Sequence, residues 1–357
     1  MDLNKVLVGM SGGVDSSVAA LLLKNDGYSI DGVTLSLYDG EKCGSSKDIE
    51  DAAAVCEKLN LKHFVFDFKD KFKTAVIEKF IAEYQSGNTP NPCIECNKHI
   101  KFGEMLKAAN EIGYQKIATG HYAQIKKQGD RFVVTKALDK SKDQSYVLYS
   151  LSQNQLANTL LPLGSFSKAE VRALAEQNGL ITAHKSDSQD ICFVPDGDYT
   201  DFISKWLGVT FPKGDYIDLS GKVIGSHAGM IRYTIGQRKG LGMGFGKHMY
   251  VLDKLPNENK VILGDEEHLF KTKVLVKDVN FMAMEKLDAP INCLGKLRYR
   301  HNEQPCRITP LSDDVLLAEF NEPQRAPTYG QAAVFYDGDT VICGGVIETF
   351  DVSSNYE

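Results

Sequence analysis

The chain has 357 residues, a formal net charge of −6 and 43% hydrophobic residues. This length typically folds as two or three domains, and this hydrophobic content supports ordinary cores. No stretch approaches the roughly 18 apolar residues of a membrane span, so no membrane partner is expected. Because the net charge is negative, a nucleic-acid partner would have to bind local basic patches.

The amino terminus and the cysteines indicate a cellular compartment. The first predicted strand begins at residue 5, which leaves no room for a signal peptide. The chain has 8 cysteines, and without a secretion signal these indicate reduced thiols rather than a disulfide framework. We therefore expect a cytoplasmic protein.

Residues 5–17 carry the strongest local signal. The apolar run 6–10 predicts a buried strand, Ser11-Gly12-Gly13 predicts a turn, and a helix follows until 25–27. A glycine turn before a helix attracts anions, because unpaired N–H groups and the helix dipole point at it. Asp15 adds a carboxylate that could hold Mg²⁺ beside phosphates. The pattern is neither a Walker A loop nor Gly-x-Gly-x-x-Gly, and the plain alternative is an ordinary strand–turn–helix.

Strands and helices alternate in the first part of the chain. Strands are predicted at 29–37 and 63–68, and helices at 48–59 and 74–84. Such alternation predicts an α/β fold with a parallel sheet and helices on both faces. Ligands of these folds bind at the carboxyl ends of the strands, where the 11–16 loop lies.

A proline-bounded segment at 86–97 is predicted to be a loop and carries Cys93 and Cys96. A helix over 98–112 would place Cys96 at or just before its N-terminus, where the thiol pKa falls. The nearby cations that would add to this effect are Lys98, His99 and Lys101. A zinc half-site or a buried structural thiol are the alternatives, although a four-cysteine zinc site needs a second close pair that the sequence lacks.

Three further segments carry polar residues in the first half of the chain. A strand over 116–123 contains Gly120-His121 near its carboxyl end, which favours substrate contact over a packed histidine. The basic stretch 126–142, alone, would be a solvated face. A polar loop at 185–197 carries Cys192, whose alternative role is a small buried hydrophobe.

The pattern changes at about residue 206. Glycines at 221–246 predict a small hairpin-rich unit, and only strand signals remain after 271. Six short strands predict a small antiparallel barrel, at 273–279, 294–300, 306–311, 315–320, 332–336 and 341–347. We therefore predict domains at 1–205, 206–270 and 271–357.

The loop at 11–16 resembles the Ser-Gly-Gly-x-Asp-Ser loop of the N-type ATP pyrophosphatases, the PP-loop superfamily. Further motifs narrow this resemblance to the bacterial tRNA-specific 2-thiouridylases, over nearly the whole chain. These are Asn91-Pro-Cys-Ile-Glu-Cys-Asn-Lys-His-Ile-Lys-Phe-Gly103, Ala118-Thr-Gly-His-Tyr122, Lys142-Asp-Gln-Ser-Tyr146, Asp187-Ser-Gln-Asp-Ile-Cys-Phe193, Tyr233-Thr-Ile-Gly-Gln-Arg-Lys-Gly-Leu-Gly242 and Gly330-Gln-Ala-Ala-Val-Phe-Tyr336.

The resemblance implies a PP-loop domain, a small central domain and a C-terminal β-barrel. It also implies ATP-dependent thiolation at C2 of the wobble uridine by a tRNA-uridine 2-sulfurtransferase. Leu35 and Gly120 would flank the nucleotide, and Asp15 would hold Mg²⁺ with ATP. The ATP-binding loop would comprise Gly9, Met10, Ser11, Gly12, Gly13, Val14, Asp15 and Ser16.

The resemblance also assigns the sulfur and tRNA chemistry. Cys96 matches the nucleophile and Cys192 the cysteine that carries a persulfide, while Asn91, Pro92 and Cys93 match positions that approach the target base. The remaining positions that match tRNA contacts are His121, Lys142, Asp143, Gln144, Arg298, Tyr299, Arg300 and Gln331. The implied partners are tRNAs for Lys, Glu and Gln, and a cysteine desulfurase or sulfur-relay protein as donor.

One position departs from the family. Cys93 stands where some members have aspartate, so an acid–base role there is in doubt and a metal or redox role becomes open. Two thiols fit the chemistry, because Cys96 can release sulfur from a Cys192 persulfide by forming a disulfide with it. An iron–sulfur cluster held by Cys93, Cys96 and Cys192 is the alternative.

Two other functions remain open on the residues alone. A PP-loop amide or amidine synthetase would use an amine and no thiol, so the cysteine pair argues against it. A tRNA-binding protein that has lost catalysis would use the barrel alone, and the intact 11–16 loop argues against that. In an active thiouridylase, the target base must leave its stack to reach the site.

Overall fold

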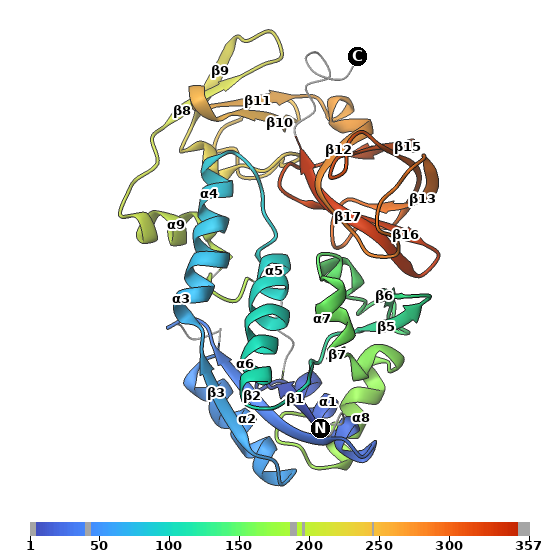
Figure 1. The fold of residues 1–357 in the computed structure, drawn as a ribbon. Helices are drawn as coiled ribbons and strands as arrows, with labels where there is room; N and C mark the ends of the chain where they lie inside the picture. The colour runs from blue at the N-terminus through green and yellow to red at the C-terminus, as the bar shows by residue number, and fades with distance from the viewer. Residues whose placement is uncertain (1–4, 40–43, 186–190, 195–196, 245, 349–357) are drawn as a thin grey trace.

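The computed structural model describes residues 5–39, 44–185, 191–194, 197–244 and 246–348 (Figure 1). Its strands form three sheets: a five-stranded parallel sheet, a four-stranded sheet and an eight-stranded sheet that contains a closed barrel. No helix in these residues is long and apolar enough to cross a membrane.

The parallel sheet has the order β3-β2-β1-β4-β7. Its strands are β1 (Lys5–Gly9), β2 (Ser29–Ser36), β3 (His63–Asp67), β4 (Lys116–Ala118) and β7 (Thr159–Leu160). The chain builds outward from β1 to β3 and then returns to the other side of β1 at β4. The order therefore reverses between β1 and β4, and such a reversal point is where α/β sheets bind ligands. The predicted α/β fold with a parallel sheet is confirmed.

Helices cover both faces of this sheet. α1 (Val14–Asn25), α2 (Ser46–Lys58) and α8 (Lys168–Gln177) contribute to the core on one face. The other face is covered by α3 (Lys69–Phe72), η1 (Lys73–Glu78), α4 (Lys79–Gln85), α5 (Pro92–Glu95), η2 (Cys96–Glu104) and α6 (Met105–Glu111). Within β1, Val6, Leu7 and Val8 are all 0% exposed, as expected for a strand buried on both faces.

The predicted strand at 116–123 is shorter in the structure. β4 ends at Ala118, and a new strand, β5 (Ala123–Gln128), begins after a turn. β5 pairs antiparallel with β6 (Arg131–Lys136), so the basic stretch is a β-ribbon and not a simple solvated face. The ribbon joins the eight-stranded sheet, because Thr135 of β6 pairs with Thr340 of the barrel. Its segment closes with η3 (Ser145–Leu148), α7 (Gln153–Ala157) and η4 (Pro162–Ser165).

The central unit follows α9 (Tyr199–Leu207). It contains the sheet β10-β11-β8-β9, built from β8 (Gly214–Ile217), β9 (Val223–His227), β10 (Tyr250–Leu255) and β11 (Lys260–Gly264). Two short 3-10 turns complete it, η6 (Met230–Arg232) and η7 (Pro256–Glu258). Its core is a separate cluster around Tyr216, Val251 and Leu263.

The C-terminal barrel follows η8 (Glu266–Leu269). Its strands are β12 (Phe270–Phe281), β13 (Ile291–Lys296), β14 (Gln304–Pro310), β15 (Leu316–Arg325), β16 (Ala332–Asp337) and β17 (Thr340–Glu348). Pairing of β12 with both β15 and β17 closes the barrel, which removes exposed strand edges. The predicted six-stranded antiparallel barrel is confirmed. One strand is offset: β13 ends at Lys296, so Tyr299 and Arg300 lie in the turn that follows it.

The three units contact one another directly. The backbone N–H of Thr89 donates to the carbonyl of Tyr329 in the barrel unit at 2.8 Å. Gly87 packs against Pro256 of the central unit so closely that a Cβ there would lie 2.9 Å from the proline ring. The boundaries 1–205, 206–270 and 271–357 stay a prediction.

Candidate active site

The loop after β1 leaves helix N–H groups available at its turn. Gly13 is the N-cap of α1 and provides no side-chain cap, so the first N–H groups of the helix lack that partner. Gly12 has φ +67°, and a Cβ there would lie 2.7 Å from the carbonyl oxygen of Asp48. Only glycine fits this close approach. The loop therefore offers an anion site at the reversal point of the sheet.

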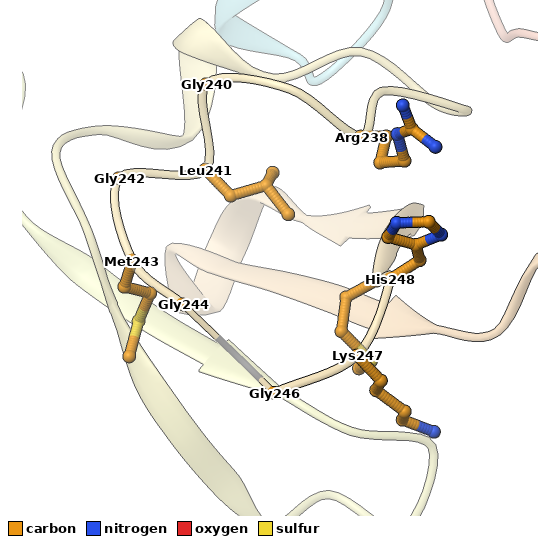
Figure 2. A pocket seen from close by; sticks show the side chains of 10 residues that line it. Arg238, Gly240, Leu241, Gly242, Met243, Gly244, Gly246, Lys247 and His248 are labelled. Carbon is orange, nitrogen blue, oxygen red and sulfur yellow. The ribbon is translucent and has the colours of Figure 1, made fainter.

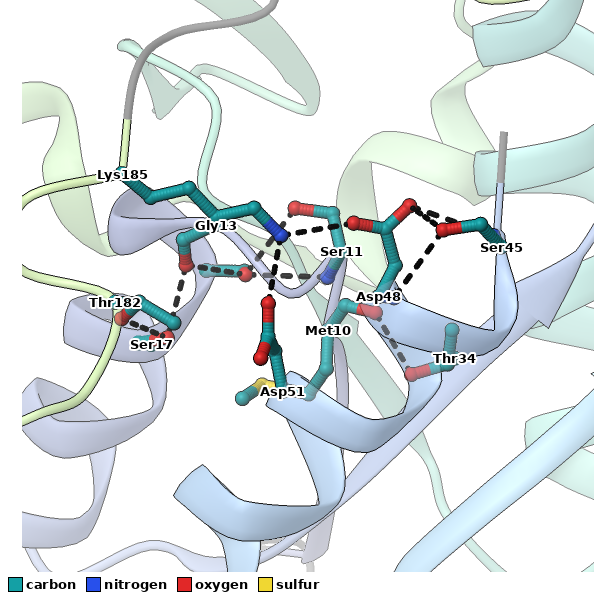
Figure 3. Close-up of polar contacts among 11 residues, drawn as sticks. Met10, Ser11, Gly13, Ser17, Thr34, Ser45, Asp48, Asp51, Thr182 and Lys185 are labelled. Carbon is teal, nitrogen blue, oxygen red and sulfur yellow. Dashed lines mark hydrogen bonds and ion pairs between the residues drawn. The ribbon is translucent and has the colours of Figure 1, made fainter. Parts of the chain in front are cut away.

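Serine hydroxyls fix the loop in this shape (Figure 3). The Ser11 N–H donates to Ser16 Oγ at 3.1 Å, and Ser16 Oγ donates to the Gly13 carbonyl at 3.1 Å. Ser17 Oγ donates to the same carbonyl at 2.8 Å and accepts from Thr182 Oγ1 at 2.9 Å. Of the predicted nucleotide residues, Met10 and Val14 are buried in the core, so only their backbone could contact ATP. Leu35 lies half-buried on the neighbouring strand β2.

Asp15 has protein partners that the sequence did not reveal. Lys168 Nζ lies 2.7 Å from Asp15 Oδ1 and 2.8 Å from Oδ2. The Tyr122 hydroxyl donates to Oδ1 at 2.7 Å. The carboxylate predicted to hold Mg²⁺ is therefore already bound to a cation.

A second lysine lies beside the loop. Lys185 Nζ is 2.9 Å from both Asp48 Oδ1 and Asp51 Oδ2 (Figure 3). Asp48 also forms a capping box with Ser45 at the start of α2. Because the Asp48 backbone touches Gly12, this ion pair fixes the start of the Cys192 segment next to the loop. Residues 186–190 and 195–196 of the predicted 185–197 loop lie outside the described residues.

Gly120 and His121 connect the loop to the cysteines. A Cβ on Gly120 would lie 2.8 Å from the Ser16 nitrogen, so the segment after β4 packs directly on the first turn of α1. His121 is buried, and its Nδ1 lies 2.8 Å from Thr119 Oγ1. Burial and then the positive charge of Lys101 hold the pKa of His121 well below its usual value. The imidazole is therefore neutral at pH 7 and offers no positive charge to a phosphate.

The cysteine helix begins earlier than the sequence predicts. α5 starts at Pro92, and Asn91 caps it by accepting from the Cys93 N–H at 3.1 Å. The segment 92–97 is thus helical, and the prediction of a loop with a helix from residue 98 was wrong. Proline is suited to the first helical position, where its missing N–H costs nothing. Cys93 therefore lies in the first turn and Cys96 one turn further along.

Burial dominates the thiol chemistry of this helix. Cys96 is 7% exposed, and burial raises its pKa to about 12, with the charge of Lys101 offsetting only part of that rise. The predicted low pKa of Cys96 was wrong, because the sequence does not show burial. Cys93 keeps an exposed side chain, yet the protein atoms around its sulfur also raise its pKa.

The structure brings the three predicted cysteines together. Cys192, half-buried, lies close enough to raise the pKa of both Cys93 and Cys96. The positive charge of Lys101 acts in the opposite direction on the two thiols, where it offsets part of the rise in pKa caused by burial. The same charge adds to the effect of burial in lowering the pKa of His121. Cys96 and Lys101 both belong to the π-helix η2, where backbone hydrogen bonds join residues five apart. From the sequence alone, Lys101 was only one of several cations near the cysteines.

An iron–sulfur cluster does not fit this arrangement. In the described part of the chain, no three His, Cys, Asp or Glu side chains are grouped so that they could hold a metal ion.

The predicted tRNA contacts fall into two groups. Lys142 is half-buried and Arg300 is exposed. Tyr299 is 38% exposed, and its pKa is raised by burial first, then by Asp143 and by the nearby Cys93 thiol. Tyr299 therefore brings an aromatic ring from the barrel unit to the neighbourhood of Cys93.

Other residues predicted to contact tRNA form hydrogen bonds within the protein. Asp143 is buried and accepts from the Ala137 N–H at 2.9 Å and from Ser145 Oγ at 2.7 Å. Gln144 Oε1 accepts from the Tyr122 N–H at 2.9 Å, and Gln331 Nε2 donates to the Thr89 carbonyl at 2.6 Å. Arg298 Nη2 donates to the carbonyls of Ile235 at 3.2 Å and Ala326 at 3.0 Å. These side chains position the segments that carry the exposed ones.

A separate cavity lies in the central unit (Figure 2). It has a volume of about 670 Å³ and is lined mainly by the glycine-rich segment that follows Arg238, together with Lys247 and His248. Figure 2 shows these three side chains on one side of the opening and the glycine backbone on the other. No long helix follows the glycines, so they do not repeat the strand–loop–helix arrangement after β1.

Family models match the chain in three parts. They are described as a tRNA methyl transferase HUP domain at residues 4–196, a tRNA methyl transferase PRC-barrel domain at 200–265 and an aminomethyltransferase beta-barrel domain at 271–347. Among solved structures, the tRNA thiolase NcsA of Methanococcus maripaludis has a TM-score of 0.35 and 24% identity, covering 56% of this chain and 65% of that one. That likeness is too small to carry an argument.

Curated relatives match over nearly their whole length. The tRNA-specific 2-thiouridylase MnmA of Clostridium botulinum (strain Eklund 17B / Type B) is 47% identical over 352 residues, covering 96% of this chain and 98% of the relative. That of Clostridioides difficile (strain 630) is 46% identical over 353 residues, covering 96% and 98%. On this similarity, the chain belongs to the tRNA-specific 2-thiouridylase family.

Proposed function

We propose that this protein uses ATP to replace the C2 oxygen of the wobble uridine of tRNA with sulfur. One observation supports this above the others: the nucleotide loop and the cysteines are linked by packing and by a shared charge. Gly120 packs on the first turn of α1, and the charge of Lys101 acts both on His121, the neighbour of Gly120, and on the Cys93 and Cys96 thiols. A site that adenylates a base and then delivers sulfur to it needs both halves adjacent.

The nucleotide half activates the uridine. The C2 oxygen attacks the α-phosphorus of ATP, the bond to the β-phosphate oxygen breaks, and pyrophosphate leaves with the electron pair. The N–H groups at Gly12–Val14 and the N-terminus of α1 would hold the phosphates. Mg²⁺ bound with ATP would neutralise phosphate charge, and the Asp15 carboxylate is the ligand that this chain offers for it.

The cysteine half delivers sulfur. Cys192 would carry a persulfide. The Cys96 sulfur would attack the inner sulfur of that persulfide, which is the Cys192 Sγ. The Cys192–Cys96 disulfide forms, the Cys96 proton is lost, and the terminal sulfur leaves as hydrosulfide with the electron pair. Hydrosulfide then attacks C2, and AMP leaves with the former uridine oxygen. An external thiol must reduce the disulfide before the next turnover.

The high pKa of Cys96 fits this order of events. A neutral buried thiol reacts slowly with stray electrophiles, so Cys96 reacts only when the persulfide is next to it. The nearby Lys101 ammonium stabilises negative charge as the thiol proton leaves.

tRNA would approach across the cysteine helix and the barrel. The exposed Tyr299 ring near Cys93 can stack on a base that has left its helix, since aromatic stacking tolerates any base. We propose that tRNAs for Lys, Glu and Gln are the substrates, and that a cysteine desulfurase or relay protein loads Cys192.

The deciding experiment is mass analysis of tRNA nucleosides. Unmodified tRNA is incubated with the protein, ATP, Mg²⁺ and a persulfide donor, with omission of each as controls. The expected product is uridine with one oxygen replaced by sulfur, formed only in the complete mixture. Pyrophosphate release with an amine incorporated instead would indicate a synthetase, and a methylated nucleoside would contradict the proposal.

A further inference from the structure

Lys168 occupies a position where helix physics disfavours it. It is the first residue of α8, and Ser167 caps that helix in a capping box with Glu170. Acidic residues are favoured in the first turn because the helix dipole is positive there, and a lysine is disfavoured. A cation retained at this position needs a partner that compensates for the dipole.

The partner is the carboxylate at the nucleotide loop. Lys168 Nζ contacts both oxygens of Asp15, at 2.7 and 2.8 Å, and lies 5.8 Å from the centroid of the Tyr122 ring. The Lys168 side chain is 11% exposed and that of Asp15 is 32% exposed. The Lys168 backbone N–H is held by Asp139 Oδ2 at 3.1 Å, which fixes where the side chain begins. The ammonium is therefore largely enclosed, on the side of α8 that faces the loop.

The sheet topology explains why Asp15, Tyr122 and Lys168 lie together. Asp15 follows β1, Tyr122 follows β4, and Lys168 opens the helix that follows β7. β1, β4 and β7 are neighbours in the parallel sheet, so their carboxyl ends bring these residues to one edge. This is the edge at which the phosphates of ATP would bind.

We propose that Lys168 is a phosphate-binding residue that Asp15 holds in reserve. When Mg²⁺–ATP enters, the ammonium moves from the carboxylate to the β- and γ-phosphates, and Asp15 becomes available to Mg²⁺. This deepens, and rests on, the proposed function, in which ATP is cleaved between the α- and β-phosphates. Lys168 then stabilises the negative charge that gathers on the departing pyrophosphate.

Two chemical features support the exchange over a purely structural ion pair. A polyphosphate carries more negative charge than one carboxylate and attracts the ammonium more strongly. Both oxygens of Asp15 are engaged by Lys168, so the carboxylate cannot present both to a metal until the lysine moves. The same motion therefore readies both groups.

The test measures binding of ATP without metal, in EDTA, by equilibrium dialysis. Lys168→Met should weaken metal-free ATP binding by about 10-fold or more, the loss expected for one charge-assisted contact. Lys168→Arg keeps the charge and should retain most of the affinity. Asp15→Asn should bind metal-free ATP more tightly than wild type, because the competing carboxylate is gone. Loss of the carboxylate also removes its repulsion of the phosphates, so this arm includes the double variant Asp15→Asn/Lys168→Met: if Lys168 binds the phosphates the double variant loses the gain, and if the lysine is only structural the gain remains.

A matched control is Lys136→Met. Lys136 is equally enclosed, 9% exposed, and its Nζ lies 2.6 Å from Glu303 Oε2, on the ribbon that joins the barrel. Its loss should lower thermal stability and leave ATP binding unchanged. If Lys168→Met does not fold, Lys168→Gln and Lys168→Arg provide the same comparison on folded protein.

The inference is overturned if folded Lys168→Met or Lys168→Gln binds metal-free ATP as wild type does, or if Asp15→Asn binds it more weakly. The proposed function fails separately: wild-type protein that binds ATP but forms no thiolated nucleoside would contradict the thiolation and leave the Lys168 measurement intact.

Discussion

Single side chains in this site depend on burial more than on their neighbours in the sequence. The position of Cys96 near a helix start suggests a reactive thiolate, but burial raises its pKa to about 12. The same applies to His121, which burial keeps neutral. Lys168 escaped prediction entirely, because nothing in the sequence links it to a carboxylate 153 residues away. The loop at 11–16 and the three cysteines were predictable, since their motifs are local; their charge states were not.

The cysteines should separate by reactivity. At pH 8, a thiol-alkylating reagent should label exposed Cys93 well before buried Cys96, followed by peptide mass mapping. Because the folded pKa of Cys96 is raised, its labelling rate should keep rising as pH increases beyond 9. Faster labelling of Cys96 than Cys93 at pH 8 would contradict the burial described here.

Thiolation activity should separate the three cysteines in a different way from their rates of labelling. The balanced sulfur transfer needs only two thiols, so Cys96→Ser and Cys192→Ser should each abolish thiolation, while Cys93→Ser should keep substantial activity. Anaerobically purified protein provides the check: if activity tracks bound iron and Cys93→Ser is as inactive as the other two, the persulfide route is wrong.

At the scale of elements, the sequence located four of the five parallel strands, the six barrel strands and four of the helical segments. Alternation and turn residues are local signals, so they marked these elements; the short β7 and the strands of the ribbon and the central unit were not predicted individually. The errors occurred where a local signal has two meanings. Pro92 was taken as a loop residue although it opens α5, and the run 116–123 was taken as one strand although the chain turns after Ala118. Asn91 caps the helix that begins at Pro92, and the segment after Ala118 packs on the first turn of α1 instead of continuing the strand.

The cap of the cysteine helix offers an element-scale test. Asn91→Ala removes the acceptor for the Cys93 N–H and should destabilise the protein by about 1 kcal/mol, whereas Asn91→Asp should be close to neutral. Denaturant unfolding measures both. The alanine variant should also speed Cys96 labelling, because the turn that covers the thiol opens more often. Equal stability of the two variants would show that the cap contributes nothing.

For the whole molecule, neighbouring arginines have separate tasks. Arg298 joins the central unit to the barrel through hydrogen bonds to the carbonyls of Ile235 and Ala326, while the side chain of Arg300 is exposed and is predicted to contact tRNA. The overall charge of −6 makes such local cations important for RNA binding.

Variants of these residues should distinguish a structural role from a role in tRNA binding. Arg298→Ala leaves carbonyls without a donor and should destabilise the protein by about 1–3 kcal/mol. Arg300→Ala combined with Lys142→Ala should weaken tRNA binding and flatten its dependence on salt. Unfolding curves and a salt series of tRNA titrations measure the two effects. An unchanged salt slope would mean that Lys142 and Arg300 are ordinary surface residues.

The β5–β6 ribbon has a consequence for how the protein is made. Lys136 on the ribbon bonds to the carbonyl of Gly338, 202 residues further along the chain. At typical translation rates, the ribbon leaves the ribosome about 10–40 s before this partner exists. During that interval the β6 edge of the ribbon, which pairs with β17 in the finished fold, is open to pairing with another nascent chain. Completion of the barrel is therefore also the step that protects the newborn catalytic unit from aggregation.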